Sequence, residues 1–63
     1  MGNQPPDEVF FEFTRIGHSV RVSAIDGATG IEVTVVGPAS AAPSDLERLA
    51  LAKLKARLAK DMD

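Results

Sequence analysis

Cysteine, tryptophan and tyrosine are absent from this sequence of 63 residues, and histidine occurs only once. Without cysteine the chain forms neither a disulfide nor a thiolate metal site, and one histidine is too few for an imidazole metal cage. A chain of this length buries only about 60% of the surface that its unfolded form exposes. Since disulfides and metals are excluded, good packing or self-association must supply its stability, and we expect no metal and no cofactor.

Long apolar runs and a strong charge are lacking as well. No stretch reaches the about 20 apolar residues that a membrane-spanning helix needs. Residues 1–8 show no basic region followed by an apolar core, which a signal peptide would have. The net charge is −2, whereas a dedicated nucleic-acid-binding protein usually clusters lysine and arginine. These absences predict a cytoplasmic protein without a membrane segment.

A short polar segment precedes what is predicted to be a single domain. Residues 1–7 contain the pair Pro5–Pro6, which favours an extended chain, and we expect this lead to be flexible. A chain of this length has room for one domain only. We place that domain at residues 8–60 and treat residues 61–63 as a C-terminal tail.

Three strands are predicted, over residues 8–16, 19–26 and 31–36. Aromatic and β-branched residues dominate the first of them, which holds all three phenylalanines. In the second, apolar and polar side chains alternate with a period of two, as on a sheet with one buried face. The third strand ends at Gly37–Pro38, because proline cannot donate a hydrogen bond to the ladder.

Two turns set the register of this sheet. Gly17–His18 suits a type II′ turn between Ile16 and Ser19. The second turn, residues 26–30, starts with an aspartate that can accept from backbone N–H groups and ends with Gly30 in the left-handed conformation. Both turns place apolar residues opposite apolar residues, and a slip of one residue would invert every side chain. The predicted core face of the sheet comprises Val9, Phe11, Phe13, Val20, Val22, Ala24, Ile31, Val33 and Val35.

A helix is predicted to follow, with Ser44 as its N-cap and Glu47 completing a capping box. Residues 46–60 are nearly all strong helix formers. The connector of residues 37–43 is long enough to leave open whether the helix covers its own sheet or a neighbour's. The predicted fold class is α+β, a three-stranded antiparallel β-meander with one C-terminal α-helix packed on one face. The predicted helix seam against the sheet is Leu46, Ala50, Leu54 and Leu58.

Apolar side chains outside the predicted core indicate a protein partner. On the outer face of the sheet, Phe10 lies opposite Ile25, and exposed apolar patches often mark partner surfaces, although scattered surface hydrophobes are also normal. The helix carries more leucine than a stripe of about 100° requires. We therefore predict a non-catalytic interaction or adaptor module that self-associates, most simply as a homodimer. The candidate partner surface comprises Phe10, Ile25, Arg21, Val36 and Leu49.

A weak nucleic-acid-binding module is the alternative prediction. Lys53, Arg57 and Lys60 form a basic stripe along the helix that suits phosphates or another anion, and double-stranded RNA-binding domains end in the same β-β-β-α order. The same cations also complement the helix macrodipole, with Arg57 reaching Asp61. The sheet face is the second surface that could meet nucleic acid, although it carries carboxylates beside Arg21.

No residue is predicted to be catalytic, and no small-molecule substrate is inferred. Glu12 and Glu32 share a face, but two strand spacings and the register offset put them about 12 Å apart, beyond the about 5–9.5 Å of a glycosidase pair. Glu12 is instead expected to pair diagonally with Arg21. His18 lies at a turn tip without an orienting carboxylate, which a general base needs.

Several short segments form a pattern along the chain: Glu8-Val9-Phe10-Phe11-Glu12-Phe13, Arg15-Ile16-Gly17, Ala24-Ile25-Asp26, Thr29-Gly30, Gly37-Pro38 and the helix of residues 46–60. This pattern resembles a small bacterial protein family of unknown function, of about this length and of β-β-β-α order. The resemblance covers nearly the whole chain. Because its motifs are turns and core positions, it implies a fold and assigns no functional residue.

Overall fold

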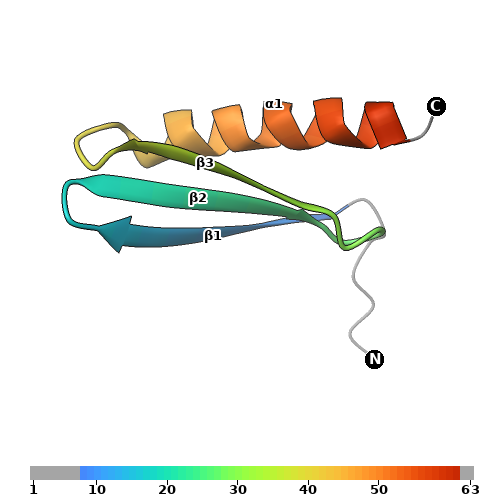
Figure 1. The fold of residues 1–63 in the computed structure, drawn as a ribbon, viewed down its shortest axis with the longest axis horizontal. Coiled ribbons are helices and arrows are strands. Elements are labelled where there is room, and N and C mark those ends of the chain that lie inside the picture. Colours follow the sequence, from blue (N-terminus) through green and yellow to red (C-terminus); the bar gives the residue numbers. More distant parts are fainter. Residues whose placement is uncertain (1–7, 62–63) are drawn as a thin grey trace.

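The computed structural model describes residues 8–61, which form three antiparallel strands and one helix (Figure 1). The strands are β1 (Val9–Ile16), β2 (Ser19–Asp26) and β3 (Glu32–Pro38), and the helix is α1 (Pro43–Asp61). The sheet order is β1-β2-β3, and α1 packs against its own sheet. The predicted α+β fold class is therefore confirmed. The predicted flexible lead of residues 1–7 lies outside the described residues, whereas Asp61, assigned to the tail, belongs to the helix.

The first hairpin has the predicted turn. Gly17 has a φ of 60°, and no non-glycine residue among those described has a positive φ. A positive φ at the first loop residue only defines a type II′ turn, whose twist matches that of the two strands. Ile16 pairs with Ser19, and the predicted register is confirmed along the whole of β1 and β2.

The second turn is held together by Asp26. Its carboxylate accepts hydrogen bonds from the Thr29 backbone N–H at 2.9 Å and from the Thr29 hydroxyl at 2.7 Å. Its backbone carbonyl accepts from the N–H of Gly30 at 2.8 Å, where a φ of 76° ends the loop. Its own N–H donates to the carbonyl of Ile31 at 2.8 Å. One aspartate thus fixes the whole loop and with it the pairing of β2 with β3.

The core lies between the inner face of the sheet, which faces α1, and the predicted seam of the helix. Residues on this face pair as predicted, with Val22 opposite Val35 and Ala24 opposite Val33. Leu58 packs at the margin of the core. The buried apolar residues of the core are Val22, Ala24, Val33, Leu46, Ala50 and Leu54.

Phe13 departs from the prediction that it belongs to the core. It lies on the inner face opposite Val22, as predicted, but 44% of it is exposed. The helix makes its main contacts with β2 and β3, and β1 is the strand farthest from it (Figure 1). A helix is about 10 Å wide and strands lie about 4.8 Å apart, so a single helix covers about two strands. The inner face of β1 is therefore left partly open beside the helix.

The start of α1 also differs from the prediction. The helix begins at Pro43, and the carbonyl of Ala42 accepts from the N–H of Asp45 at 3.0 Å and from that of Leu46 at 3.3 Å. Ala42 is therefore the cap, and Ser44 lies within the first turn, so the predicted capping box with Glu47 is wrong. Proline favours the first helical position, because its fixed φ suits the helix and its missing N–H would have no partner there.

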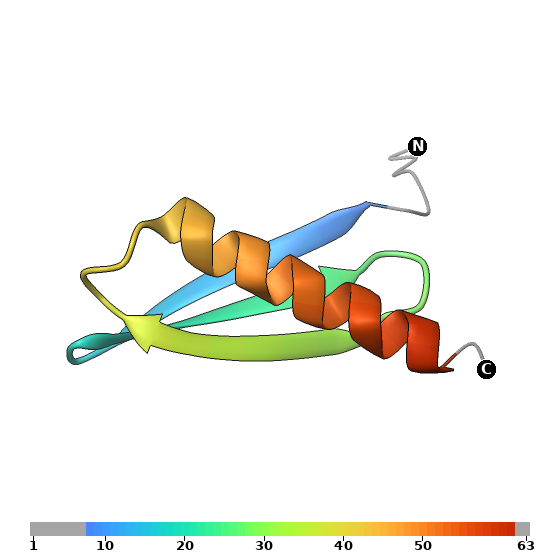
Figure 2. The same cartoon turned by 90° about the horizontal axis from the view of Figure 1, so that it is seen from above.

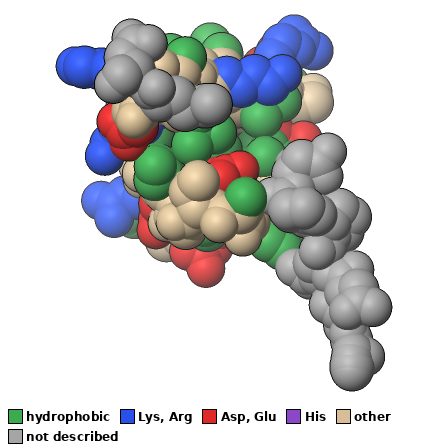
Figure 3. All heavy atoms as spheres, turned by 90° about the vertical axis from the view of Figure 1, so that its right-hand side faces the viewer, with side chains coloured by type: hydrophobic (Ala, Val, Ile, Leu, Met, Phe, Trp, Pro, Cys, Tyr) green, Lys and Arg blue, Asp and Glu red, His purple; other side chains and the backbone are tan. Residues whose placement is uncertain are grey.

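Leu46 anchors this end of the helix on Gly37. A Cβ atom added to Gly37 would overlap the Leu46 side chain, so the leucine occupies the space that any other residue would need. From this anchor α1 runs obliquely across the strands (Figure 2). At the opposite end of the molecule, where β1 begins and α1 ends, hydrophobic side chains gather on the surface between sheet and helix (Figure 3).

Candidate interaction surface

The outer face of the sheet holds four of the five residues of the predicted partner surface. Phe10 pairs with Ile25, and Arg21 pairs with Val36. The pair Ser23–Thr34 separates these two rows, with 3.2 Å between the hydroxyl oxygens. Within residues 8–61 no helix or strand covers this face.

Leu49 does not join this surface. It lies on α1, which packs on the inner face, and 59% of it is exposed. The structure thus divides the predicted partner surface between two sides of the molecule. A single partner patch cannot include both the outer face and Leu49 without wrapping around an edge of the sheet.

Phe10 is less exposed than an isolated surface phenylalanine. A Cβ atom added to Gly27 would lie 3.2 Å from Phe10 Cε2 and 2.8 Å from the carbonyl oxygen of Glu8, so the ring and the backbone close over this glycine. Ile25, its cross-strand partner, is also half-buried. These residues form a small apolar cluster at one end of the outer face.

The expected ion pair between Glu12 and Arg21 is not formed. Glu12 faces Ser23 across the strands, and Arg21 faces Thr14. Within the described part of the chain, the ion pairs closer than 4.0 Å lie on the helix, between Arg48 and Asp45 and between Arg57 and Asp61. Glu12 and Arg21 therefore have no ion-pair partner among residues 8–61.

Two exposed apolar residues of β1 lie outside the predicted partner surface. Phe13 is 44% exposed on the inner face, and Ile16 is 55% exposed on the outer face. Ile16 was not included in the predicted partner surface, and Phe13 was predicted to belong to the core. The width of one helix against three strands is the signal that could have found Phe13.

The two edges of the sheet differ in how their backbone groups are used. Beside β3, Lys53 Nζ reaches from the helix to donate a 2.7 Å hydrogen bond to the Thr34 carbonyl oxygen. Pro38, at the end of β3, has no N–H to offer. A lysine and a proline at an edge are two recognised obstacles to strand addition. The β1 edge carries neither a lysine nor a proline among residues 9–16.

The predicted basic stripe is not an open group of three cations. Lys53 is engaged with Thr34, and Arg57 Nε donates to Asp61 Oδ2 at 3.2 Å, as predicted. Lys60 lies in the last turn of the helix, where its charge complements the macrodipole.

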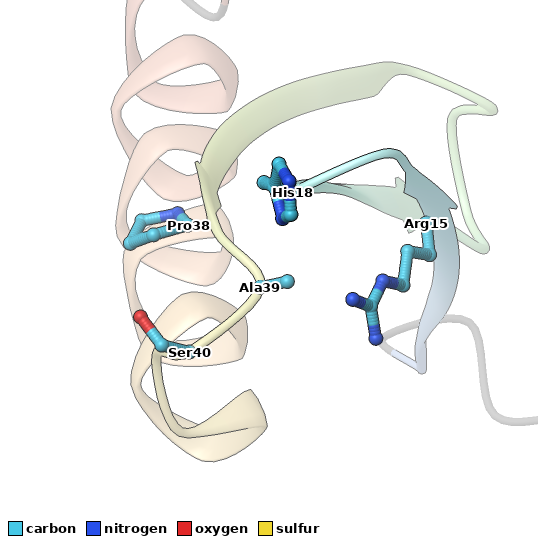
Figure 4. A pocket seen from close by; sticks show the side chains of 5 residues that line it. All are labelled: Arg15, His18, Pro38, Ala39 and Ser40. Atoms are coloured by element: carbon cyan, nitrogen blue, oxygen red, sulfur yellow. The ribbon is translucent and has the colours of Figure 1, made fainter.

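An open hollow of about 410 Å³ lies between the first hairpin and the connector that leads to α1. Its lining residues are Arg15, His18, Pro38, Ala39 and Ser40. Arg15 and His18 point into the hollow, whereas the hydroxyl of Ser40 points away from them (Figure 4). Arg15 Nε is already bonded to the Gly17 carbonyl at 3.0 Å. The lining therefore brings no carboxylate or nucleophile into contact with His18.

Among residues 8–61, no three His, Asp or Glu side chains lie together in a way that would hold a metal ion. No helix in the same range has the length and the apolar character needed to cross a membrane.

Comparison with known proteins identifies the family of this chain. A family model described as a domain of unknown function (DUF6898) matches residues 6–61. The chain belongs to this family. No curated protein and no solved structure matched the chain. The DUF6898 match spans all three strands and the helix, so the family corresponds to the complete β-β-β-α unit, in agreement with the resemblance found in the sequence.

Proposed function

We propose that this DUF6898 protein is a small cytoplasmic, non-catalytic interaction module that self-associates through β1. The observation that carries the proposal is the pair of exposed apolar side chains on this strand, Phe13 at 44% and Ile16 at 55%. They lie on opposite faces of β1, next to an edge without lysine or proline. A partner placed along this edge would cover both residues at once.

The size of the domain supports self-association as well. Its buried core consists of six apolar side chains, three of which are alanine or valine from the sheet. Fully burying a side chain such as phenylalanine or isoleucine is favourable by about 1.5–3 kcal/mol. In a symmetric dimer the same residues are buried in both copies. Covering Phe13 and Ile16 would therefore add substantially to the apolar surface that the small core buries.

Sedimentation equilibrium from about 1 μM to about 1 mM tests this proposal, since that range brackets the affinities of small transient interfaces. We expect a monomer–dimer equilibrium for the unchanged chain. Phe13→Glu and Ile16→Glu should each shift it toward monomer. Leu49→Glu is the matched control, because Leu49 is similarly exposed but lies on the helix.

Two results would overturn the proposal. The first is a monomer at every concentration. The second is a dimer that Leu49→Glu dissociates while both β1 variants, folded by circular dichroism, leave it intact.

A further inference from the structure

We infer that a second copy of this chain adds to β1 in antiparallel fashion, with Phe13 of each copy at the two-fold axis. This inference rests on the proposed self-association and specifies its geometry. The product is a six-stranded sheet in the order β3-β2-β1-β1-β2-β3, with both helices on one face.

The backbone groups that β1 offers are fixed by its pairing with β2. The N–H of Gly27 donates to the carbonyl of Glu8 at 2.8 Å. Since hydrogen-bonded and non-bonded pairs alternate along an antiparallel ladder, the even-numbered residues of β1 bond to β2. The odd-numbered residues, which include Phe11, Phe13 and Arg15, direct their N–H and C=O groups outward from the edge. A strand that pairs here gains about six backbone hydrogen bonds.

On the inner face, the Phe13-centred register places the two Phe13 rings side by side. Each helix lies over β2 and β3 of its own copy, so the rings fill the trough that remains between the helices. The adjacent pair brings Arg15 of one copy opposite Phe11 of the other, where the guanidinium can lie against the ring face. Phe13, which the helix of its own copy leaves 44% exposed, thus lies at the centre of the interface.

On the outer face, the same register brings Phe10 opposite Ile16 of the second copy. It therefore extends the Phe10–Ile25 cluster by a third apolar side chain and covers the exposed isoleucine. Glu12 falls opposite Thr14 of the second copy, and Thr14 is the cross-strand neighbour of Arg21. Arg21, Thr14 and the other copy's Glu12 then lie side by side on three neighbouring strands. The Arg21 guanidinium and the Glu12 carboxylate of the other copy can therefore approach each other across Thr14.

The competing registers are less complementary. Centring the axis on Glu12 places two carboxylates directly opposite each other, which is unfavourable. Centring it on Phe11 sets Glu12 opposite Phe10 and leaves Ile16 without a partner. Centring it on Thr14 leaves Phe10 outside the paired segment. The Phe13-centred register alone covers both exposed side chains and gives Glu12 an opposite charge in its row.

Cross-linking tests the register cleanly because the chain has no cysteine of its own. In the inferred register, positions 12 and 14 of different copies form a pair that is not hydrogen-bonded, with about 4.5 Å between Cα atoms. That separation lies within the range that a disulfide spans. An equal mixture of Glu12→Cys and Thr14→Cys chains should therefore oxidise mainly to the mixed disulfide, which intact mass distinguishes from either homodimer. Leu49→Cys gives the rate of random collision.

The outcomes separate this inference from the proposed function. Sedimentation of both variants under reducing conditions first establishes whether they form dimers. A dimer that yields the mixed product at least about tenfold faster than Leu49→Cys, equivalent to about 1.4 kcal/mol, supports the register. A dimer that yields mainly the Glu12→Cys or the Thr14→Cys homodimer, or no product above the collision rate, overturns the register and leaves self-association standing. Monomeric chains overturn both.

Discussion

Leu46 sits directly over Gly37, where its side chain takes the place that a Cβ atom would occupy. This contact joins the first turn of α1 to the last residues of β3. It thereby sets where the helix starts its path across the sheet. A residue with a Cβ atom here would have to displace the buried end of the Leu46 side chain, whereas the backbone itself makes no demand for glycine because Gly37 does not have a positive φ.

We expect Gly37→Ala to lower the free energy of unfolding by about 1–3 kcal/mol, the usual cost of overpacking. For a domain of this size each kcal/mol lowers the Tm by about 4–8 °C. Urea and thermal unfolding followed by circular dichroism measure the change. Leu46→Val, which shortens the side chain over the glycine, should recover part of the loss in the double variant. Equal losses with and without Leu46→Val would show that the overlap is not the cause.

Asp26→Ala should destabilise the fold by about 1–2 kcal/mol, because the N–H and the hydroxyl of Thr29 lose their acceptor. Asp26→Asn keeps one carbonyl oxygen and should lose less. Thr29→Ala removes the 2.7 Å hydroxyl contact and the exposed 3.1 Å acceptor of the Ile31 N–H, but it keeps the bond from the Thr29 N–H to Asp26, so it should fall between the unchanged chain and Asp26→Ala. Denaturant unfolding ranks the three variants, and a different order would refute this account of the turn.

Lys53→Met keeps the aliphatic stem of the side chain but removes its hydrogen bond to Thr34. We expect the fold to remain within about 1 kcal/mol of its original stability, because the contact is exposed. The β3 edge, however, should now accept other strands, so species larger than a dimer should appear in sedimentation velocity. Lys55→Met causes the same change in charge at another exposed position of α1 and should leave the assembly unchanged. Identical profiles for the two variants would remove the role assigned to Lys53.

Titration with labelled duplex DNA or RNA should show no binding at about 0.15 M salt, because phosphate binding depends on several available cations. Two of the three cations in the stripe are already engaged, Lys53 with Thr34 and Arg57 with Asp61. Binding that disappears in a Lys53→Glu and Arg57→Glu double variant would instead favour the nucleic-acid alternative. Binding that the double variant retains would point to the sheet face.

The fold and register followed from the sequence because they depend on local chemistry. Gly17 and Gly30 each adopt a positive φ, which is characteristic of a particular type of turn. The type and length of the turn then determine which residues of the two strands face each other. The helix seam followed from leucine spacing in the same way. The ends of the elements were less accurate, since β3 runs to Pro38 and the helix runs to Asp61. The start of the helix was misplaced because Ser44 suited a cap so well that the preference of Pro43 for the first turn was overlooked.

The candidate surface was harder to predict because it depends on how α1 is placed across the strands. Alternation along β1 correctly assigned Phe13 to the inner face, yet it carries no information on which strands the helix covers. The contact between Lys53 and Thr34 joins residues 19 positions apart in the chain, and no local pattern indicates it. Sequence patterns therefore could not predict the exposure or the contacts of side chains that depend on how two separate elements pack together.

The hydroxyl pair Ser23–Thr34 limits the tendency of the outer sheet face to associate non-specifically. It crosses the middle of the outer face between the Phe10–Ile25 row and Val36, which is 66% exposed. A band of hydroxyl groups keeps the two apolar ends apart, so neither grows into the large continuous patch that promotes aggregation. Replacing the pair with two valines would join them, and the colloidal solubility of the protein should then fall even if its folded structure is unchanged.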